Sequence, residues 1–171
     1  MSQKIAYVTG GMGGIGTAIC QRLAKDGFKV IAGCGPNSPR KDRWIGEQKA
    51  LGYDFIASEG NVSDWDSTVA AFDKVKAEVG RVDVLVNNAG ITKDSVFRKM
   101  TPEQWKAVID TNLNSLFNVT KQVVDGMADG LHINAACGDV GRDQDTDTAV
   151  LNFGQGAWTL ALVHVAMQGH C

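Results

Sequence analysis

The sequence contains no apolar run of about 18 residues, so it offers no segment long enough to cross a bilayer as a helix. The longest apolar candidate, residues 157–167, is shorter and contains His164. The N-terminus lacks the basic and then apolar pattern of a signal peptide. A formal charge of −2 provides no excess of positive charge to attract nucleic acid or an acidic membrane. These absences predict a cytoplasmic protein with no membrane partner and no nucleic-acid partner.

Recognisable metal motifs are also missing. The spacing of the four cysteines matches neither a zinc site nor a redox pair, which predicts reduced thiols at Cys20, Cys34, Cys137 and Cys171. The acidic run 143–148 resembles the start of a calcium loop. Such a loop needs glycine at its sixth position and glutamate at its twelfth, where this sequence has Thr148 and Gly154. The sequence therefore predicts no metal site.

The last part of the chain lacks several residue types. No tyrosine follows Tyr53 and no lysine follows Lys121. Residues 122–171 also lack proline and glutamate, and they carry six aspartates against one arginine. Residues 1–121, by contrast, have a positive balance of charge. The shift indicates either a tail of different origin or an ordinary acidic loop that differs by chance.

Before the tail, apolar runs of strand length alternate with segments of helical periodicity. Strands are expected over 4–9, 28–33, 54–58 and 82–86, and helices over 17–26, 43–51, 64–79 and from 101 through 112 toward 121. This alternation predicts an α/β fold with a parallel sheet and right-handed crossovers. In the tail, a strand over 131–134, an acidic loop and a helix over 157–167 are expected.

A glycine-rich loop separates the first expected strand from the first expected helix. Gly10 suits a tight turn, Gly14 lets the backbone approach a pyrophosphate, and Gly16 lets the helix pack closely on the sheet. Main-chain N–H groups at the start of the helix would then face the phosphates. The loop therefore predicts a dinucleotide site formed by Gly10, Met12, Gly13, Gly14, Ile15 and Gly16. The alternative is an ordinary glycine-rich turn.

The spacing of this loop, Thr-Gly, three residues and then Gly-Ile-Gly, resembles that of the short-chain dehydrogenase/reductase family. Asn87-Asn88-Ala89-Gly90 follows the fourth strand, where the family has the same four residues. Gly60-Asn61-Val62 follows the third strand, where the family contacts the adenine. The resemblance implies a Rossmann-like doubly wound parallel sheet, here truncated at its C-terminal end. It also implies cofactor contacts at Gly35, Gly60, Asn61, Val62, Asn88, Ala89, Gly90, Ile91 and Thr92.

The segment after the second strand predicts the choice of cofactor. An acidic residue there would bind the ribose 2′-hydroxyl of NAD, and residues 32–38 contain none. Arg40 follows closely and is suited to a 2′-phosphate, because its guanidinium offers a fork of donors. We therefore expect NADPH as the cofactor. The alternative is that Arg40 belongs to a solvated basic turn.

Over residues 1–129 the closer resemblance is to family members that reduce acetoacetyl-CoA to (R)-3-hydroxybutyryl-CoA for polyhydroxybutyrate synthesis. This implies a dinucleotide-binding domain over 1–129, a divergent tail over 130–171 and an acyl-CoA substrate. Asp94 matches a position near the acyl-CoA pocket, although a solvated loop aspartate is the alternative. Asn112 matches the family asparagine that holds a proton-relay water, and a helix-surface asparagine is the alternative there.

The family serine, tyrosine and lysine of the active site have no equivalents in this chain. Ala135-Ala136-Cys137 stand where serines are expected, and a Tyr-x-x-x-Lys pair cannot occur after Tyr53. The family is homo-oligomeric, and the portion that makes its main oligomer contacts is also expected to be missing. We therefore expect impaired catalysis. The chain is then a truncated or frameshifted reductase, a homologue that kept only dinucleotide binding, or an inert fragment.

Overall fold

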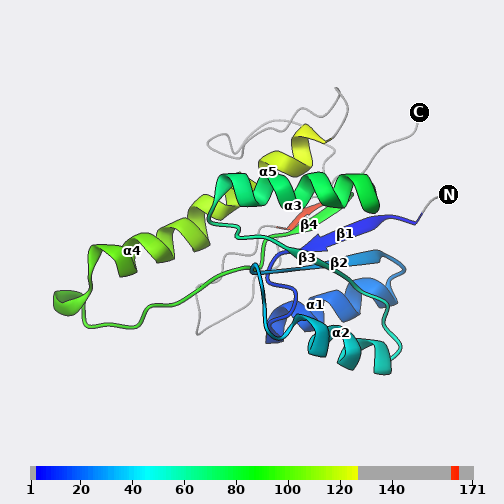
Figure 1. Cartoon of the computed structure of the whole chain (residues 1–171), viewed down its shortest axis with the longest axis horizontal. Helices are drawn as coiled ribbons and strands as arrows, with labels where there is room; N and C mark the ends of the chain where they lie inside the picture. The colour runs from blue at the N-terminus through cyan, green and yellow to red at the C-terminus, as the bar shows by residue number, and fades with distance from the viewer. Residues whose placement is uncertain (1–2, 127–162, 166–171) are drawn as a thin grey trace, which may run out of the picture.

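The computed structural model describes residues 3–126 and 163–165, and within them a five-stranded sheet lies between two layers of helices (Figure 1). The strand order is β3-β2-β1-β4-β5. The first four strands are mutually parallel, as the alternation of elements predicted, with bounds β1 (Ile5–Val8), β2 (Lys29–Cys34), β3 (Ile56–Glu59) and β4 (Val84–Val86). The α/β, Rossmann-like fold is confirmed.

Helices cover both faces of the sheet. The elements α1 (Gly14–Lys25) and α2 (Lys41–Ala50) lie on one face, and α3 (Trp65–Glu78) and α5 (Ser115–Asp125) lie on the other. A 3₁₀ turn, η1 (Phe97–Lys99), precedes α4 (Pro102–Ile109), which projects beyond the sheet in Figure 1. A π-helical segment, η2 (Asp110–Asn114), joins α4 directly to α5. The helix expected from 101 toward 121 is therefore one rod with a change of winding in its middle.

Strand β1 shows why this sequence makes a buried central strand. Side chains alternate between the two faces of a sheet, and here both faces are covered by helices. Ala6 and Val8 join the core cluster on the side of α1 and α2. Ile5 and Tyr7 join the second cluster, on the side of α3 and α5. All four are buried, so the strand reads as a continuous apolar run.

Several helix boundaries follow from local chemistry that is visible in the sequence. Asp64 caps α3, because its carboxylate accepts a hydrogen bond from the Ser67 N–H at 2.8 Å. Thr101 and Gln104 form a reciprocal capping box at the start of α4, with Pro102 in the first turn. The first three helices each end near a glycine with positive φ, at Gly27, Gly52 and Gly80.

The fifth strand corrects two expectations. Val163–Val165, which we expected within a helix over 157–167, form β5 and pair antiparallel with β4. The sheet is therefore not wholly parallel. A short apolar run with β-branched residues does not distinguish helix from strand by periodicity, and the Val-His-Val alternation suits the edge beside β4. The strand expected over 131–134 and the remainder of the tail helix lie outside the described residues.

No helix among the described residues is long and apolar enough to span a membrane. The same part of the chain contains no group of three or more side chains placed to hold a metal ion.

Candidate functional site

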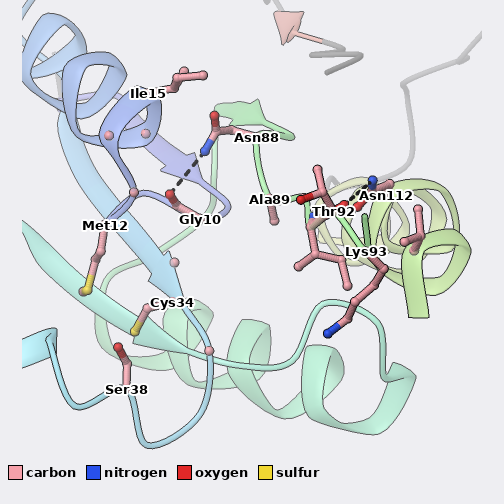
Figure 2. A pocket seen from close by; sticks show the side chains of 18 of the residues that line it. Gly10, Met12, Ile15, Cys34, Ser38, Asn88, Ala89, Thr92, Lys93 and Asn112 are labelled. Carbon is pink, nitrogen blue, oxygen red and sulfur yellow. Dashed lines mark hydrogen bonds between the residues drawn. The ribbon is translucent and has the colours of Figure 1, made fainter. Parts of the chain in front are cut away.

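A cleft of about 1040 Å³ opens at the carboxyl ends of the parallel strands (Figure 2). In open α/β sheets this is the edge at which ligands bind. The loops after β1, β2 and β4 contribute to its walls, together with one face of the α4–α5 rod. The predicted site residues that line it are Gly10, Met12, Gly13, Gly14, Ile15, Gly16, Gly35, Arg40, Asn88, Ala89, Gly90, Ile91, Thr92 and Asn112.

In the glycine loop, Gly10 and Gly16 are required by the protein's own geometry, whereas Gly14 leaves space in front of the loop. Gly10 adopts φ +63°, which side chains rarely tolerate. A Cβ on Gly16 would lie 2.2 Å from the Gly10 carbonyl oxygen, so no side chain fits there. A Cβ on Gly14 would meet nothing within 4 Å. The space in front of Gly14 is therefore open to a ligand, as the expected approach of a pyrophosphate requires.

The start of α1 presents unsatisfied donors to this space. Gly13 is the N-cap and supplies no capping side chain, and the first turn contains no acidic residue. Among the described residues, no group accepts a hydrogen bond from the main-chain N–H of Gly14, Ile15 or Gly16. Free N–H groups and the positive end of the helix dipole together suit phosphate oxygens. The chain thus fits a dinucleotide pyrophosphate.

Thr9 links the glycine loop to the loop after β4, a role that we did not predict. Its hydroxyl accepts hydrogen bonds from the main-chain N–H groups of Asn88 and Ala89, each at 2.9 Å. The same hydroxyl donates to the Val86 carbonyl at 3.3 Å. Thr9 is buried, so these bonds are shielded from water. The family-like Thr-Gly dipeptide was the available signal.

Asn88 closes the other side of this junction. Its side-chain amide donates to the Thr9 carbonyl oxygen at 2.9 Å. It also donates to the Gly10 carbonyl oxygen at 3.2 Å (Figure 2). The amide nitrogen is therefore used to fix the glycine loop. Asn88 holds the glycine loop in shape while its neighbours Ala89 and Gly90 line the cleft.

Asn112 lies in the π-helical segment, and its side chain forms two hydrogen bonds with the main chain of Ile91. Its Oδ1 accepts from the Ile91 N–H at 2.8 Å, and its Nδ2 donates to the Ile91 carbonyl at 2.9 Å. Turns of π-helix occur often at functional sites, because the extra residue redirects side chains. The side chain thus positions the loop after β4. The proton-relay role that the family resemblance implies remains a prediction.

The loop after β2 carries polar and charged groups to the far end of the cleft. Ser38 and Arg40 line it beside Cys34, and Arg40 is exposed at the rim. The Lys41 ammonium lies 3.2 Å from the Glu59 carboxylate. Burial and the nearby Glu59 raise the pKa of the Cys34 thiol, while Lys41 opposes them. The thiol is consequently held in its protonated form.

Four predicted residues do not line the cleft. Gly60 lies next to a cleft residue, because its N–H donates to the Cys34 carbonyl at 2.9 Å. The Asn61 side-chain oxygen accepts from both the N–H and the hydroxyl of Ser63. Val62 and Asp94 are also absent from the lining, although Lys93 belongs to it. Ligand contacts at these four positions remain predictions.

The sequence analysis did not predict that apolar residues of the α4–α5 rod form one wall of the cleft. Trp105, Val108 and Leu116 of the rod line the cleft on either side of Asn112, and Met100, which precedes α4, lines it as well. Positions 105, 108, 112 and 116 recur at intervals of three and four, which is the spacing of one helix face. That periodicity was the signal available in the sequence. The wall gives this end of the cleft a surface suited to an apolar group.

Neither tyrosine of the chain is placed to act in the cleft. Tyr7 is 3% exposed, and its hydroxyl donates to Ser58 Oγ at 3.1 Å. Burial raises the pKa of Tyr7 to about 12. The ring of Tyr53 stacks on Phe55 with centroids 5.3 Å apart. Neither lines the cleft, and the Ala135-Ala136-Cys137 segment lies outside the described residues.

The chain has an α/β fold with a cleft at the carboxyl ends of its strands and a glycine loop between a strand and a helix N-terminus. Comparison with known proteins makes the class specific. A family model described as short chain dehydrogenase matches residues 4–141, which extends past the expected boundary at residue 129. The chain belongs to the short-chain dehydrogenase/reductase family.

Proteins of similar sequence include an acetoacetyl-CoA reductase from Cupriavidus necator. It is 66% identical over 175 residues, covering 99% of this chain and 71% of the relative. Nodulation protein G from Azospirillum brasilense is 51% identical, over 95% of this chain and 68% of that protein. An acetoacetyl-CoA reductase from Allochromatium vinosum is 41% identical, over 93% of this chain and 67% of that protein.

Solved structures of similar fold span about twice the length of the matched region. An actinorhodin polyketide ketoreductase with NADPH superposes with a TM-score of 0.67 at 32% identity, covering 72% of this chain and 47% of that chain. A gluconate 5-dehydrogenase from Burkholderia cenocepacia, in complex with NADP and tartrate, gives 0.65 at 28% identity, over 73% and 49%.

Proposed function

We propose that the chain binds NADPH in the cleft. The steric arrangement of the glycine loop supports this most directly, because Gly16 admits no side chain while the space before Gly14 stays open. The free N–H groups at the start of α1 would hold the pyrophosphate. Arg40, at the far end of the cleft, would pair with the 2′-phosphate. Two similar solved structures hold NADP or NADPH by their own descriptions.

We further propose that the chain derives from enzymes that reduce acetoacetyl-CoA to (R)-3-hydroxybutyryl-CoA in the cytoplasm for polyhydroxybutyrate synthesis. Two of the relatives above carry that enzyme name. Bound NADPH would supply a hydride to the ketone carbon. In this chain the apolar wall around Trp105 would exclude water, and Asn112 would fix the loop beside the reacting end. Asp94 would contact the acyl-CoA from that same loop.

Reduction of a ketone also needs a proton donor in the site, and here the chain departs from its family. Tyr7 is buried in the core and its hydroxyl is hydrogen-bonded to Ser58, while the ring of Tyr53 stacks on Phe55. No lysine follows Lys121 to serve as the partner of a tyrosine. We therefore propose that residues 1–129 form a dinucleotide-binding domain with impaired catalysis, followed by a divergent tail over 130–171. Loss of a general acid costs about 10²–10⁴ in rate.

The test combines binding and turnover on the purified 171-residue chain. NADPH binding is followed by the fluorescence of the nicotinamide, and turnover by NADPH consumption with acetoacetyl-CoA. We expect binding without turnover above a no-protein blank. Turnover would show that another group supplies the proton and would overturn the proposed impairment. Absence of both binding and a cooperative thermal transition would identify an inert fragment.

A further inference from the structure

A charged pair lies beside the cleft at the ends of β2 and β3. These strands are parallel neighbours, and Glu59, the last residue of β3, pairs in register with Cys34, the last residue of β2. Cys34 lines the cleft. Lys41 begins α2 directly after Arg40, and its ammonium lies 3.2 Å from the Glu59 carboxylate. Glu59 thus pairs with the cation that follows, in sequence, the arginine expected to bind the 2′-phosphate.

The two neighbouring cations differ in their partners. Within residues 3–126 and 163–165, Lys41 lies 3.2 Å from the Glu59 carboxylate and 4.0 Å from that of Asp42, whereas no carboxylate lies within 4.0 Å of Arg40. The neighbouring Glu59 carboxylate also raises the pKa of Lys41. The side chains of Lys41 and Glu59 are 31% and 37% exposed, so water screens the pair only in part. An incoming phosphate must therefore compete with Glu59 for the Lys41 charge.

We propose that Glu59 is a specificity-determining residue that limits the preference for NADPH over NADH by withholding the Lys41 ammonium from the 2′-phosphate. The inference rests on the proposed binding of NADPH in the cleft. NADH carries a neutral hydroxyl where NADPH carries the phosphate, so the charge of Lys41 affects the two dinucleotides unequally. The effect reaches the ligand through Lys41, which makes Glu59 a positioning residue.

The experiment measures the dissociation constants of NADPH and NADH by nicotinamide fluorescence for the full chain and its variants. Glu59→Gln removes the carboxylate and keeps the side-chain shape. We expect the ratio of NADH to NADPH dissociation constants to rise about two- to fivefold, the scale of one partly screened charge pair. The dissociation constant of NADH should stay unchanged. Glu59→Asp keeps the charge and should stay near the original ratio.

A matched control comes from the same helix. Arg43 and Glu47 form an ion pair at 2.7 Å on α2, and their side chains are more exposed than those of Lys41 and Glu59. Glu47→Gln breaks that pair and should leave the ratio unchanged. An equal rise in the control would reveal a general effect of net charge and would overturn the assignment to Glu59.

The route through Lys41 is tested by repeating Glu59→Gln in a Lys41→Gln chain. We expect the rise to disappear there, because no ammonium is left to be released. A rise of the same size in both backgrounds would mean direct repulsion by Glu59 and would overturn the route. An unchanged ratio in a chain that binds NADPH would overturn the inference alone. A chain that binds neither dinucleotide would overturn the proposed function, and the inference with it.

Discussion

At the scale of single residues, the shape of the cleft depends on glycines without a Cβ as well as on side chains that form hydrogen bonds. Gly16 brings α1 so close to the loop after β1 that a Cβ would overlap the Gly10 carbonyl. Thr9 supplies one hydroxyl that serves three main-chain groups. Both residues fix backbone positions. Main-chain N–H groups are then the donors that a ligand in the cleft would meet, and they do not depend on the identity of nearby side chains.

Gly16→Ala should therefore destabilise the chain and weaken NADPH binding. The overlap at 2.2 Å is with backbone, which cannot move aside cheaply, and overpacking of this kind costs about 1–3 kcal/mol. Urea unfolding gives the free-energy change. Gly46→Ala is the control, because a Cβ at this site inside α2 meets nothing within 4 Å. It should stabilise the helix by up to about 1 kcal/mol. Equal effects of the two substitutions would contradict the steric account.

At the scale of elements, the rod from α4 through the π-helical segment to α5 joins the sheet to the cleft. Val119 and Val123 of α5 pack in the core beside α3, while α4 extends past the sheet (Figure 1). The winding changes where Asn112 reaches Ile91. The rod is thus anchored at one end and carries the apolar wall of the cleft toward the other.

Asn112→Ala should loosen the loop after β4 and leave the rod helical. Two hydrogen bonds to Ile91 disappear, so hydrogen exchange of the Ile91 N–H should accelerate and NADPH should bind more weakly. Asn114→Ala, in the same π-helical segment, is the control, because the Asn114 side chain bonds only to Asp110 among the described residues. Circular dichroism should show little change for either variant. Unaltered exchange at Ile91 would contradict the positioning role of Asn112.

At the scale of the whole molecule, two buried groups that can lose a proton lie in the cores on opposite faces of the sheet. Burial raises the pKa of Cys20 from 9.0 to about 12, and that of Tyr7 from 10.0 to about 12. Thiolate and phenolate are disfavoured in these cores, because the charged form would lose its water. The folded state therefore retains protons that the unfolded chain releases.

Below about pH 9 these two groups should not affect the free energy of unfolding. As the pH rises from about 9 toward 12, the free energy of unfolding should consequently fall. Each group contributes a slope of roughly 1.4 kcal/mol per pH unit above its ordinary pKa. Tyr7→Phe keeps the ring on Phe72 and should make the decline shallower above about pH 10. Urea unfolding across this range measures both slopes. A flat profile in the original chain would show that water reaches these groups.

Much of this architecture could be predicted from local chemistry. The apolar runs, the Asp64 cap and the helix-ending glycines located the first four strands and the main helices to within a few residues. The direction of β5 could not be predicted, because a three-residue apolar run has no decisive period and its pairing depends on the free edge of β4.

The sequence by itself determined the shape of the glycine loop, because its glycine spacing sets steric limits that act within a few residues of each other. It also determined the lack of a tyrosine after Tyr53. Only the tertiary structure decided that Asn112 grips Ile91, that Tyr7 is sealed beside Ser58 and that Glu59 holds Lys41. These contacts join residues 18 to 51 positions apart, and such pairs meet only when the strands and helices have packed.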